Sequence, residues 1–181
     1  LYITGRRKDL IIFNGLNYYP QDLEQLIEQA AEVAVNGEYP FVGPNSVVAF
    51  ALDADPNKVG IVGELNTQLA RKIEQQKLSE TELIELNNLA SNIGKEIAEE
   101  FEIAVGDIAF IKTGTLPKTS SGKLQRKLTK SRYHKGELEV IWANYFSDLD
   151  SGLNLTTDKK DEVDRAIDEL ATKAKTLAYW I

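Results

Sequence analysis

The residues best suited to chemistry in this sequence lie in a loop at 113–123, which reads Thr-Gly-Thr-Leu-Pro-Lys-Thr-Ser-Ser-Gly-Lys. Glycines and small hydroxyl residues let backbone amides approach an anion closely, and Lys123 adds a positive charge on a flexible side chain. A Walker-type nucleotide loop would need Gly-x4-Gly-Lys followed by Ser or Thr. Gly114 lies too far from Gly122 for that motif, and Leu124 replaces the magnesium-binding hydroxyl. Taken alone, the loop is either an anion site of another kind or an ordinary solvated connection.

Positive charge is concentrated around this loop. The formal net charge is −7, but the segment 112–135 contains eight basic residues and no acid, which leaves 13 bases against 28 acids elsewhere. The eight are Lys112, Lys118, Lys123, Arg126, Lys127, Lys130, Arg132 and Lys135. A basic segment on an acidic body indicates a local anionic partner such as a phosphate, and it argues against general binding of nucleic acid.

The composition excludes several other kinds of chemistry. Without cysteine, the chain has no disulfide, no thiolate and no Cys-based zinc site, and its single histidine, His134, effectively excludes a His-rich metal site or a Ser-His-Asp triad. We expect no metal site in this chain. No apolar run approaches the ~20 residues of a membrane span, and no secretory signal opens the chain, so a cytoplasmic location is expected. Because the sequence starts with Leu1 and lacks methionine, we expect it to be a piece of a longer polypeptide.

A second segment of interest lies at 5–15 and reads Gly-Arg-Arg-Lys-Asp-Leu-Ile-Ile-Phe-Asn-Gly. Its apolar part at 9–13 predicts a short strand, and Asn14 with Gly15 is typical of a tight hairpin turn. By itself, this pattern is explained by a charged strand entry and a turn.

The elements around these segments predict a small mixed domain. β-Branched apolar runs at 46–52 and 59–65 flank turn residues at 53–57, which predicts an antiparallel hairpin. A third strand is expected at 107–112. Helices are expected at 21–30, 67–77, 79–101 and 124–133, and a loop at 39–45. The fold class is therefore α+β (α/β-like), with a short β-hairpin and a central sheet of about three strands flanked by helices.

Two of the predicted helices carry specific signals. Pro20 suits the first turn of the helix at 21–30. Ser79 is expected to cap the helix at 79–101, with Glu82 at the third following position. Their apolar stripes are Leu23, Leu26, Ile27 and Ala30 in the first helix, and Leu83, Leu86, Leu89, Ile93 and Ile97 in the second.

The character of the chain changes near its C-terminal end. Residues 1–146 are predicted to form one domain. The polar segment 147–157 resembles a linker, and 158–181 predicts an amphipathic helix. This helix is either the start of a linker to a downstream module or a helix that covers the surface of the domain itself.

The two segments together resemble a known superfamily. The pattern Gly5-Arg6-x-Lys8-Asp9-x-Ile11 with Gly15, followed about 100 residues later by Pro-Lys-Thr-Ser-Ser-Gly-Lys-Leu-Gln-Arg at 117–126, resembles the C-terminal domain of adenylate-forming enzymes. These include acyl-CoA synthetases, nonribosomal adenylation domains and luciferases. The run Asn-Tyr-Tyr-Pro-Gln-Asp-Leu-Glu at 17–24 and the residues at 136–140 resemble fatty acyl-AMP ligases, although Tyr18 stands where histidine is usual.

The resemblance implies an activity for the whole enzyme. It implies a small C-terminal catalytic lid, in an enzyme that activates a fatty acid with ATP and Mg2+ and passes the acyl group to the phosphopantetheine of an acyl carrier protein. Most of the ATP site would belong to an N-terminal adenylation domain outside this chain, so the isolated chain is expected to be inactive. Fatty acid and lipid metabolism, or polyketide or lipopeptide biosynthesis, would be the setting. The alternatives are the C-terminal domain of an acyl-CoA ligase and a non-catalytic module that docks a carrier protein.

The resemblance also implies roles for individual residues. Lys123 matches the catalytic lysine, which also contacts the nucleotide, and Arg6 matches a nucleotide-binding arginine. Lys8 matches the hinge about which the domain rotates, and Gly15 matches a glycine on the face used for thiol transfer, although its turn explains it equally well. The residues that either contact a carrier protein or stay solvated are Arg126, Lys127 and Lys130.

Overall fold

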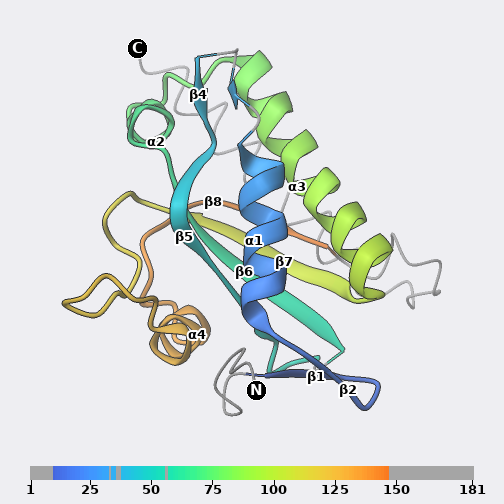
Figure 1. Ribbon diagram of the computed structural model, residues 1–181. Helices are drawn as coiled ribbons and strands as arrows, with labels where there is room; N and C mark the ends of the chain where they lie inside the picture. Colours follow the sequence, from blue (N-terminus) through green and yellow to red (C-terminus); the bar gives the residue numbers. More distant parts are fainter. Residues whose placement is uncertain (1–9, 33, 36–37, 56, 147–181) are drawn as a thin grey trace, which may run out of the picture. The chain divides into compact units, whose positions relative to one another are not determined.

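The central feature of the computed structural model is a mixed four-stranded sheet (Figure 1). The structure describes residues 10–32, 34–35, 38–55 and 57–146, and all structural statements refer to these. The strands follow the order β5-β6-β7-β8 across the sheet. Their bounds are Val42–Ala51 for β5, Lys58–Leu65 for β6, Ala104–Ile111 for β7 and Val140–Tyr145 for β8.

The direction of each strand follows from its connection. The short turn after β5 makes β5 and β6 antiparallel, which confirms the predicted hairpin. The parallel pair β6 and β7 needs a long crossover, and helices α2 (Thr67–Glu74) and α3 (Glu80–Phe101) supply it. The predicted strand at 107–112 is confirmed as β7.

The sequence prediction of about three strands missed β8, which pairs with β7 in antiparallel fashion. β8 is an edge strand, and its residues are only half-buried or exposed. One of its contacts with the neighbouring strand is made by Trp142, whose ring centroid lies 5.4 Å from that of Phe110.

Different elements cover the two faces of the sheet. Helices α1 (Pro20–Ala31) and α3 lie side by side on one face (Figure 1), where α1 packs against β5 and α3 against β7. Because side chains alternate along a strand, Val48, Phe50 and Leu52 point to the other face. There they pack with residues of the loop after β7 and of helix α4 (Arg126–His134), among them Leu116, Leu124 and Tyr133.

Two small ladders lie outside the main sheet. β1 (Ile11–Phe13) and β2 (Leu16–Tyr18) form the predicted hairpin, whose turn residues Asn14 and Gly15 have φ values of 48° and 78°. Two successive positive φ angles are typical of a type I′ turn. The predicted loop at 39–45 is wrong, since Tyr39–Pro40 forms β4, paired with β3 (Ala34–Val35), and Val42 already begins β5. The prolines remain compatible with strands because they sit in a two-residue ladder and in a bulge.

The helix predictions are largely confirmed. Pro20 begins α1, and Leu23, Ile27 and Ala30 are buried. The capping box of α3 is present in both directions: the Ser79 hydroxyl accepts from the Glu82 amide, and the Glu82 carboxylate accepts from the Ser79 amide. The core stripe of α3 holds at Leu86, Leu89, Ile93 and Ile97, all of which are buried.

Leu83 does not belong to this stripe, because 43% of its surface is exposed. The first turn of α3 instead points Glu82 inward, where it is only 2% exposed and accepts a 2.5 Å bond from Lys72 on α2. The requirements of the cap and this ion pair therefore override the apolar pattern in the first turn.

No helix of the described residues is long and apolar enough to span a membrane. Arg6, Lys8, the predicted linker at 147–157 and the predicted helix at 158–181 lie outside the described residues.

Glu82 generates a prediction about stability at low pH. The bond from Lys72, together with bonds from the Ser79 amide and hydroxyl, lowers the pKa of the Glu82 carboxyl from 4.5 to about 2. A depressed pKa in the folded state adds stability that is complete above the unfolded value and is lost as pH falls through the folded value. We expect the free energy of unfolding, measured by urea titration, to fall more steeply between pH 4.5 and pH 2 in the wild type than in Glu82→Gln. Parallel pH profiles for the two proteins would contradict this assignment.

Candidate functional site

Lys123 lies at the tip of the loop that joins β7 to α4. The tip is a tight turn, in which the Gly122 amide donates to the Thr119 carbonyl over 2.9 Å and the Thr119 amide donates to the Lys123 carbonyl over 2.8 Å. Lys118 and Leu124 form an antiparallel bridge just below it. Gly122 has φ +77°, and a Cβ there would meet nothing within 4 Å, so the backbone conformation alone favours glycine. The turn leaves Lys123 exposed.

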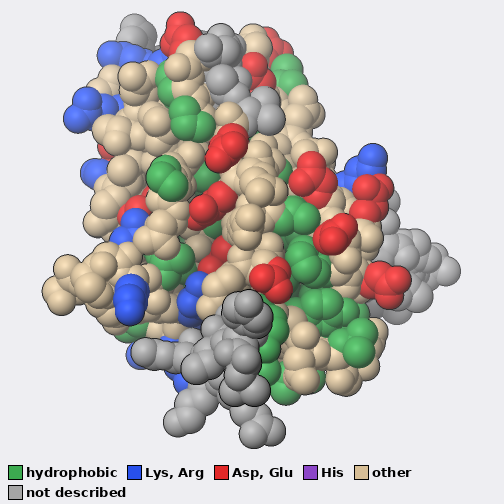
Figure 2. Space-filling model, viewed as in Figure 1, with side chains coloured by type: hydrophobic (Ala, Val, Ile, Leu, Met, Phe, Trp, Pro, Cys, Tyr) green, Lys and Arg blue, Asp and Glu red, His purple; other side chains and the backbone are tan. Residues whose placement is uncertain are grey.

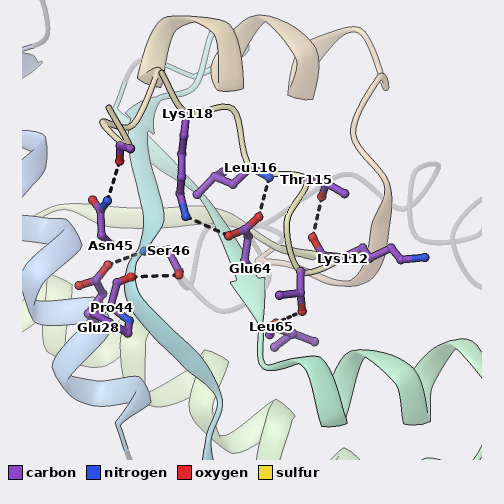
Figure 3. Close-up of polar contacts among 12 residues, drawn as sticks. Glu28, Pro44, Asn45, Ser46, Glu64, Leu65, Lys112, Thr115, Leu116 and Lys118 are labelled. Atoms are coloured by element: carbon purple, nitrogen blue, oxygen red, sulfur yellow. Dashed lines mark hydrogen bonds and ion pairs between the residues drawn. The ribbon is translucent and has the colours of Figure 1, made fainter. Parts of the chain in front are cut away.

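A buried carboxylate fixes the base of this loop (Figure 3). Glu64, near the end of β6, is 5% exposed. Its Oε1 accepts from the Leu116 amide over 2.7 Å, and its Oε2 accepts from Lys118 Nζ over 3.1 Å. A buried carboxylate is tolerated only when it is paired and hydrogen-bonded. The observed arrangement of the loop base satisfies both carboxylate oxygens of Glu64.

Further bonds attach the start of the loop to β6 and α2. The Thr113 hydroxyl donates to the Leu65 carbonyl over 2.6 Å, and the Thr115 hydroxyl donates to the Lys112 carbonyl, also over 2.6 Å. Lys112 forms a 2.7 Å ion pair with Glu74 at the end of α2. Lys112 thus has an acidic partner within the domain, in contrast to the exposed lysine at the tip.

At its other end the loop is attached to α1 through Arg126. The guanidinium group makes two bonds to Glu24, of 2.7 Å from Nε to Oε1 and 2.5 Å from Nη2 to Oε2. Glu24 is 5% exposed and also accepts from the Ala49 amide. Burial raises the pKa of the Glu24 carboxyl, and the bonds from Arg126 oppose that shift. The side chain of Arg126 therefore joins α4 to α1 and β5 and is largely enclosed.

The C-terminal half of α4 is attached to the domain through Tyr133, Lys130 and His134. Tyr133 donates a 2.8 Å bond to Asp107 on β7, and burial with this bond raises the pKa of the Tyr133 phenol above its ordinary value. Lys130 pairs with Asp53 over 2.6 Å, and this contact lowers the pKa of the Asp53 carboxyl. His134 lies 3.4 Å from the same carboxylate. These contacts fix the orientation of a helix whose first turn carries the exposed Lys127.

The charges are distributed unevenly over the surface. Figure 2 shows Lys and Arg side chains beside α4, at the lower left, and Asp and Glu side chains over α1 and α3. Of the predicted site residues, the structure therefore brings Lys123, Arg126, Lys127 and Lys130 together on the loop and the helix that follows it. Gly15 lies on a different element, the β1–β2 hairpin, where it is exposed beside Ile12 and Leu16.

Sequence reasoning missed the residues that hold the loop, above all Glu64, Glu24 and Asn45. An available signal was the single acid at the end of an otherwise apolar strand, Val-Gly-Ile-Val-Gly-Glu-Leu at 59–65. A charged residue in such a position has a buried partner more often than it has none. Asn45 gives no comparable signal, because asparagine between Pro44 and Ser46 is ordinary turn composition.

Comparison of the sequence with known proteins finds relatives among fatty-acid ligases. No protein-family model matches the chain. It is 32% identical over 139 residues to the medium-chain-fatty-acid–acyl-carrier-protein ligase JamA of Moorena producens, which covers 77% of this chain and 20% of the relative. It is 33% identical over 142 residues to a long-chain-fatty-acid–AMP ligase of Mycobacterium marinum, covering 76% of this chain and 22% of that protein. The chain thus spans about a fifth of the length of these relatives.

Two solved structures share the fold. One, from a study of fatty acyl-adenylate ligases from E. coli and L. pneumophila, has a TM-score of 0.53 and 28% identity, covering 76% of this chain and 20% of its own. The other, McyG A-PCP complexed with phenylalanyl-adenylate, has a TM-score of 0.53 and 25% identity, covering 75% of this chain and 18% of its own. The fold and these matches identify the chain as the C-terminal domain of an adenylate-forming enzyme. Within that class it resembles the fatty acyl-AMP ligases.

The anchoring of the loop by Glu64 can be tested through stability. Removal of this carboxylate in Glu64→Ala leaves the Leu116 amide and the Lys118 ammonium without their buried acceptor. We expect the free energy of unfolding to fall by about 1–3 kcal/mol, the usual cost of an unsatisfied buried polar group. Urea denaturation of the chain measures it.

The matched control is Glu99→Ala. Glu99 is 67% exposed and lies 3.7 Å from Lys95 on the same helix. Exposed pairs of this kind contribute little, so its loss should change stability by less than about 0.5 kcal/mol. Equal losses in the two variants would show that Glu64 is no anchor.

Proposed function

We propose that this chain is the C-terminal catalytic lid of a fatty acyl-AMP ligase. In the proposed reaction, a fatty acid carboxylate attacks the α-phosphorus of ATP, the bond to the bridging oxygen breaks, and pyrophosphate leaves. The acyl group then passes from the adenylate to the phosphopantetheine thiol of an acyl carrier protein, and AMP leaves. Relatives named as fatty-acid–AMP and fatty-acid–acyl-carrier-protein ligases support this substrate class.

The observation that carries the proposal is the exposed Lys123 on an anchored loop. The first step brings a carboxylate against a polyphosphate, so its barrier contains the repulsion of two anions. An ammonium group that bridges the carboxylate and the α-phosphate oxygens stabilises the charge of the transition state and aligns the reactants. Because Lys123 lies at the tip of a loop with a fixed base, domain rotation can insert it into a site on another domain.

The remaining roles in the reaction are assigned to a second domain and to three further residues of this chain. Among the described residues, no cluster of three or more His, Asp or Glu side chains is placed to hold a metal. Because the chain spans about a fifth of the length of these relatives, we assign the main site for ATP and Mg2+ to an N-terminal adenylation domain. Arg6 is proposed to contact the nucleotide and Lys8 to act as the hinge, while Gly15 faces the thiol in the second state. Such an enzyme is expected to work in the cytoplasm, in lipid metabolism or in polyketide or lipopeptide biosynthesis.

The substitution Lys123→Ala tests the catalytic assignment. In the intact enzyme, we expect the rate of acyl-adenylate formation to fall by about 10²–10³-fold, the usual effect of losing one electrostatic donor in a transition state. The measurement is fatty-acid-dependent release of pyrophosphate from ATP. The control is Lys95→Ala, which removes an exposed lysine of α3. Near-normal adenylation by Lys123→Ala would refute the assignment.

A second role for α4, as a docking surface for an acidic carrier protein, is favoured by the exposure of Lys127 at its start. The acidic partners of Arg126 and Lys130 lie within the domain. Charge reversal in Lys127→Glu should therefore weaken binding of the carrier by about two- to five-fold at low salt and leave adenylation unchanged. Titration of the intact enzyme with the carrier measures this. An affinity equal to that of Lys95→Glu would exclude Lys127 from the interface.

A further inference from the structure

The peptide group that precedes Lys123 is held from both ends. On one end, the Gly122 carbonyl accepts a 2.9 Å bond from Nδ2 of Asn45, which lies 77 residues earlier in the chain. On the other end, the Lys123 amide donates a 3.1 Å bond to the Thr119 hydroxyl. The orientation of this peptide fixes the N–Cα bond of Lys123 and, with φ at Lys123, sets the direction of its side chain. Of the two bonds, only the one from Asn45 comes from outside the loop.

Asn45 reaches the loop because β5 is interrupted at this point. Val42 pairs with Leu65 and Val47 pairs with Gly63, so the four residues 43–46 oppose the single residue Glu64. Such a bulge bends the strand outward and re-aims side chains. Asn45 has φ 54°, in the left-handed region that asparagine tolerates better than most residues.

The bulge is itself held in place (Figure 3). The Ser46 amide donates a 2.9 Å bond to the Glu28 carboxylate of α1, and the Ser46 hydroxyl donates to the Pro44 carbonyl over 3.3 Å. Ser46 is 8% exposed, so these bonds lie at the boundary of the core. A side chain that projects from this bulge is therefore presented by a fixed backbone.

Two contacts from neighbouring strands thus control one loop. Glu64 on β6 holds its base through Leu116 and Lys118, and Asn45 on β5 holds its tip through Gly122. Asn45 lies in the interruption of β5, and Glu64 is the β6 residue opposite that interruption. The contact at Gly122 lies beyond the bridge between Lys118 and Leu124, so it connects the tip of the loop directly to β5.

We propose that Asn45 is a positioning residue for Lys123 in acyl-adenylate formation; this rests on the proposed function of Lys123. Asn45 sets the orientation of the peptide before Lys123 and so the direction from which the ammonium approaches the carboxylate and the α-phosphate. It touches neither substrate. Because the proposed function places Lys123 in the first of the two half-reactions, we expect the contribution of Asn45 in that half-reaction as well.

Two substitutions of Asn45 test this role. Asn45→Gly removes the Nδ2 donor and keeps a residue that adopts positive φ without strain. Asn45→Asp keeps the shape of the side chain but turns an oxygen toward the Gly122 carbonyl. The matched control is Gln76→Gly, an exposed residue with φ 56° in the connection between α2 and α3.

The experiment measures both half-reactions of the intact enzyme. In single turnover with saturating ATP and fatty acid, we expect Asn45→Gly and Asn45→Asp to slow acyl-adenylate formation by about 3- to 10-fold, the effect of losing one neutral hydrogen bond. The KM values for both substrates, the transfer of the acyl group from preformed acyl-adenylate to the carrier, and the midpoint of urea unfolding should match those of Gln76→Gly. In a Lys123→Ala background, Asn45→Gly should cause no further loss, because its effect passes through Lys123.

Each other outcome overturns the inference. Unchanged adenylation in both Asn45 variants, equal slowing of both half-reactions, or an additive loss in the double variant would each show that Asn45 does not position Lys123. The proposed function is judged separately in the same series. Near-normal adenylation by Lys123→Ala refutes the catalytic lysine itself, whereas a defective Lys123→Ala with normal Asn45 variants refutes only the role of Asn45.

Discussion

The loop that carries Lys123 depends on one constraint, the burial of the Glu64 carboxylate near the end of a central strand. An anion in such a place is stable only with donors around it, and the donors are the Leu116 amide and the Lys118 ammonium. Both belong to the loop that follows the neighbouring strand β7. Satisfying a charge inside the sheet therefore determines the path of a segment on its surface, and a flexible, glycine-containing sequence acquires a defined shape.

Acids of the domain also bind donors on α4, the helix that follows the loop. Arg126 meets the buried Glu24, and Tyr133 meets Asp107, so both ends of α4 are attached to the domain by polar contacts that are at least partly enclosed. The basic segment at 112–135 thus contains two groups of side chains, those paired with acids of the domain and those exposed to solvent. Several of its cations neutralise acids of the domain, whereas Lys123 and Lys127 are presented to solvent. Net charge alone did not distinguish these groups.

What could be read from the sequence was governed by local rules. The Asn14-Gly15 turn, the Ser79 cap, Pro20 at the start of α1 and the strands β5, β6 and β7 each depend on neighbouring residues, and the structure confirms them. The errors arise where distant residues decide. Leu83 is exposed where the cap and the ion pair with Lys72 place Glu82 inward, and β8 is a half-buried edge strand that pairs with β7. The contact between Asn45 and Gly122 spans 77 residues and has no local signature. The family motif identified Lys123 as a candidate but not the residues that hold its loop.

The division of the loop's support among several elements has a consequence for protein engineering. The segment 113–123 forms a contiguous motif, but its conformation is encoded by α1, β5 and β6 through Glu28, Asn45 and Glu64. A chimera that receives only this segment from a relative would place a foreign loop on mismatched supports. A functional exchange between homologues therefore requires transplanting the three supporting positions together with the loop, as a single discontinuous unit.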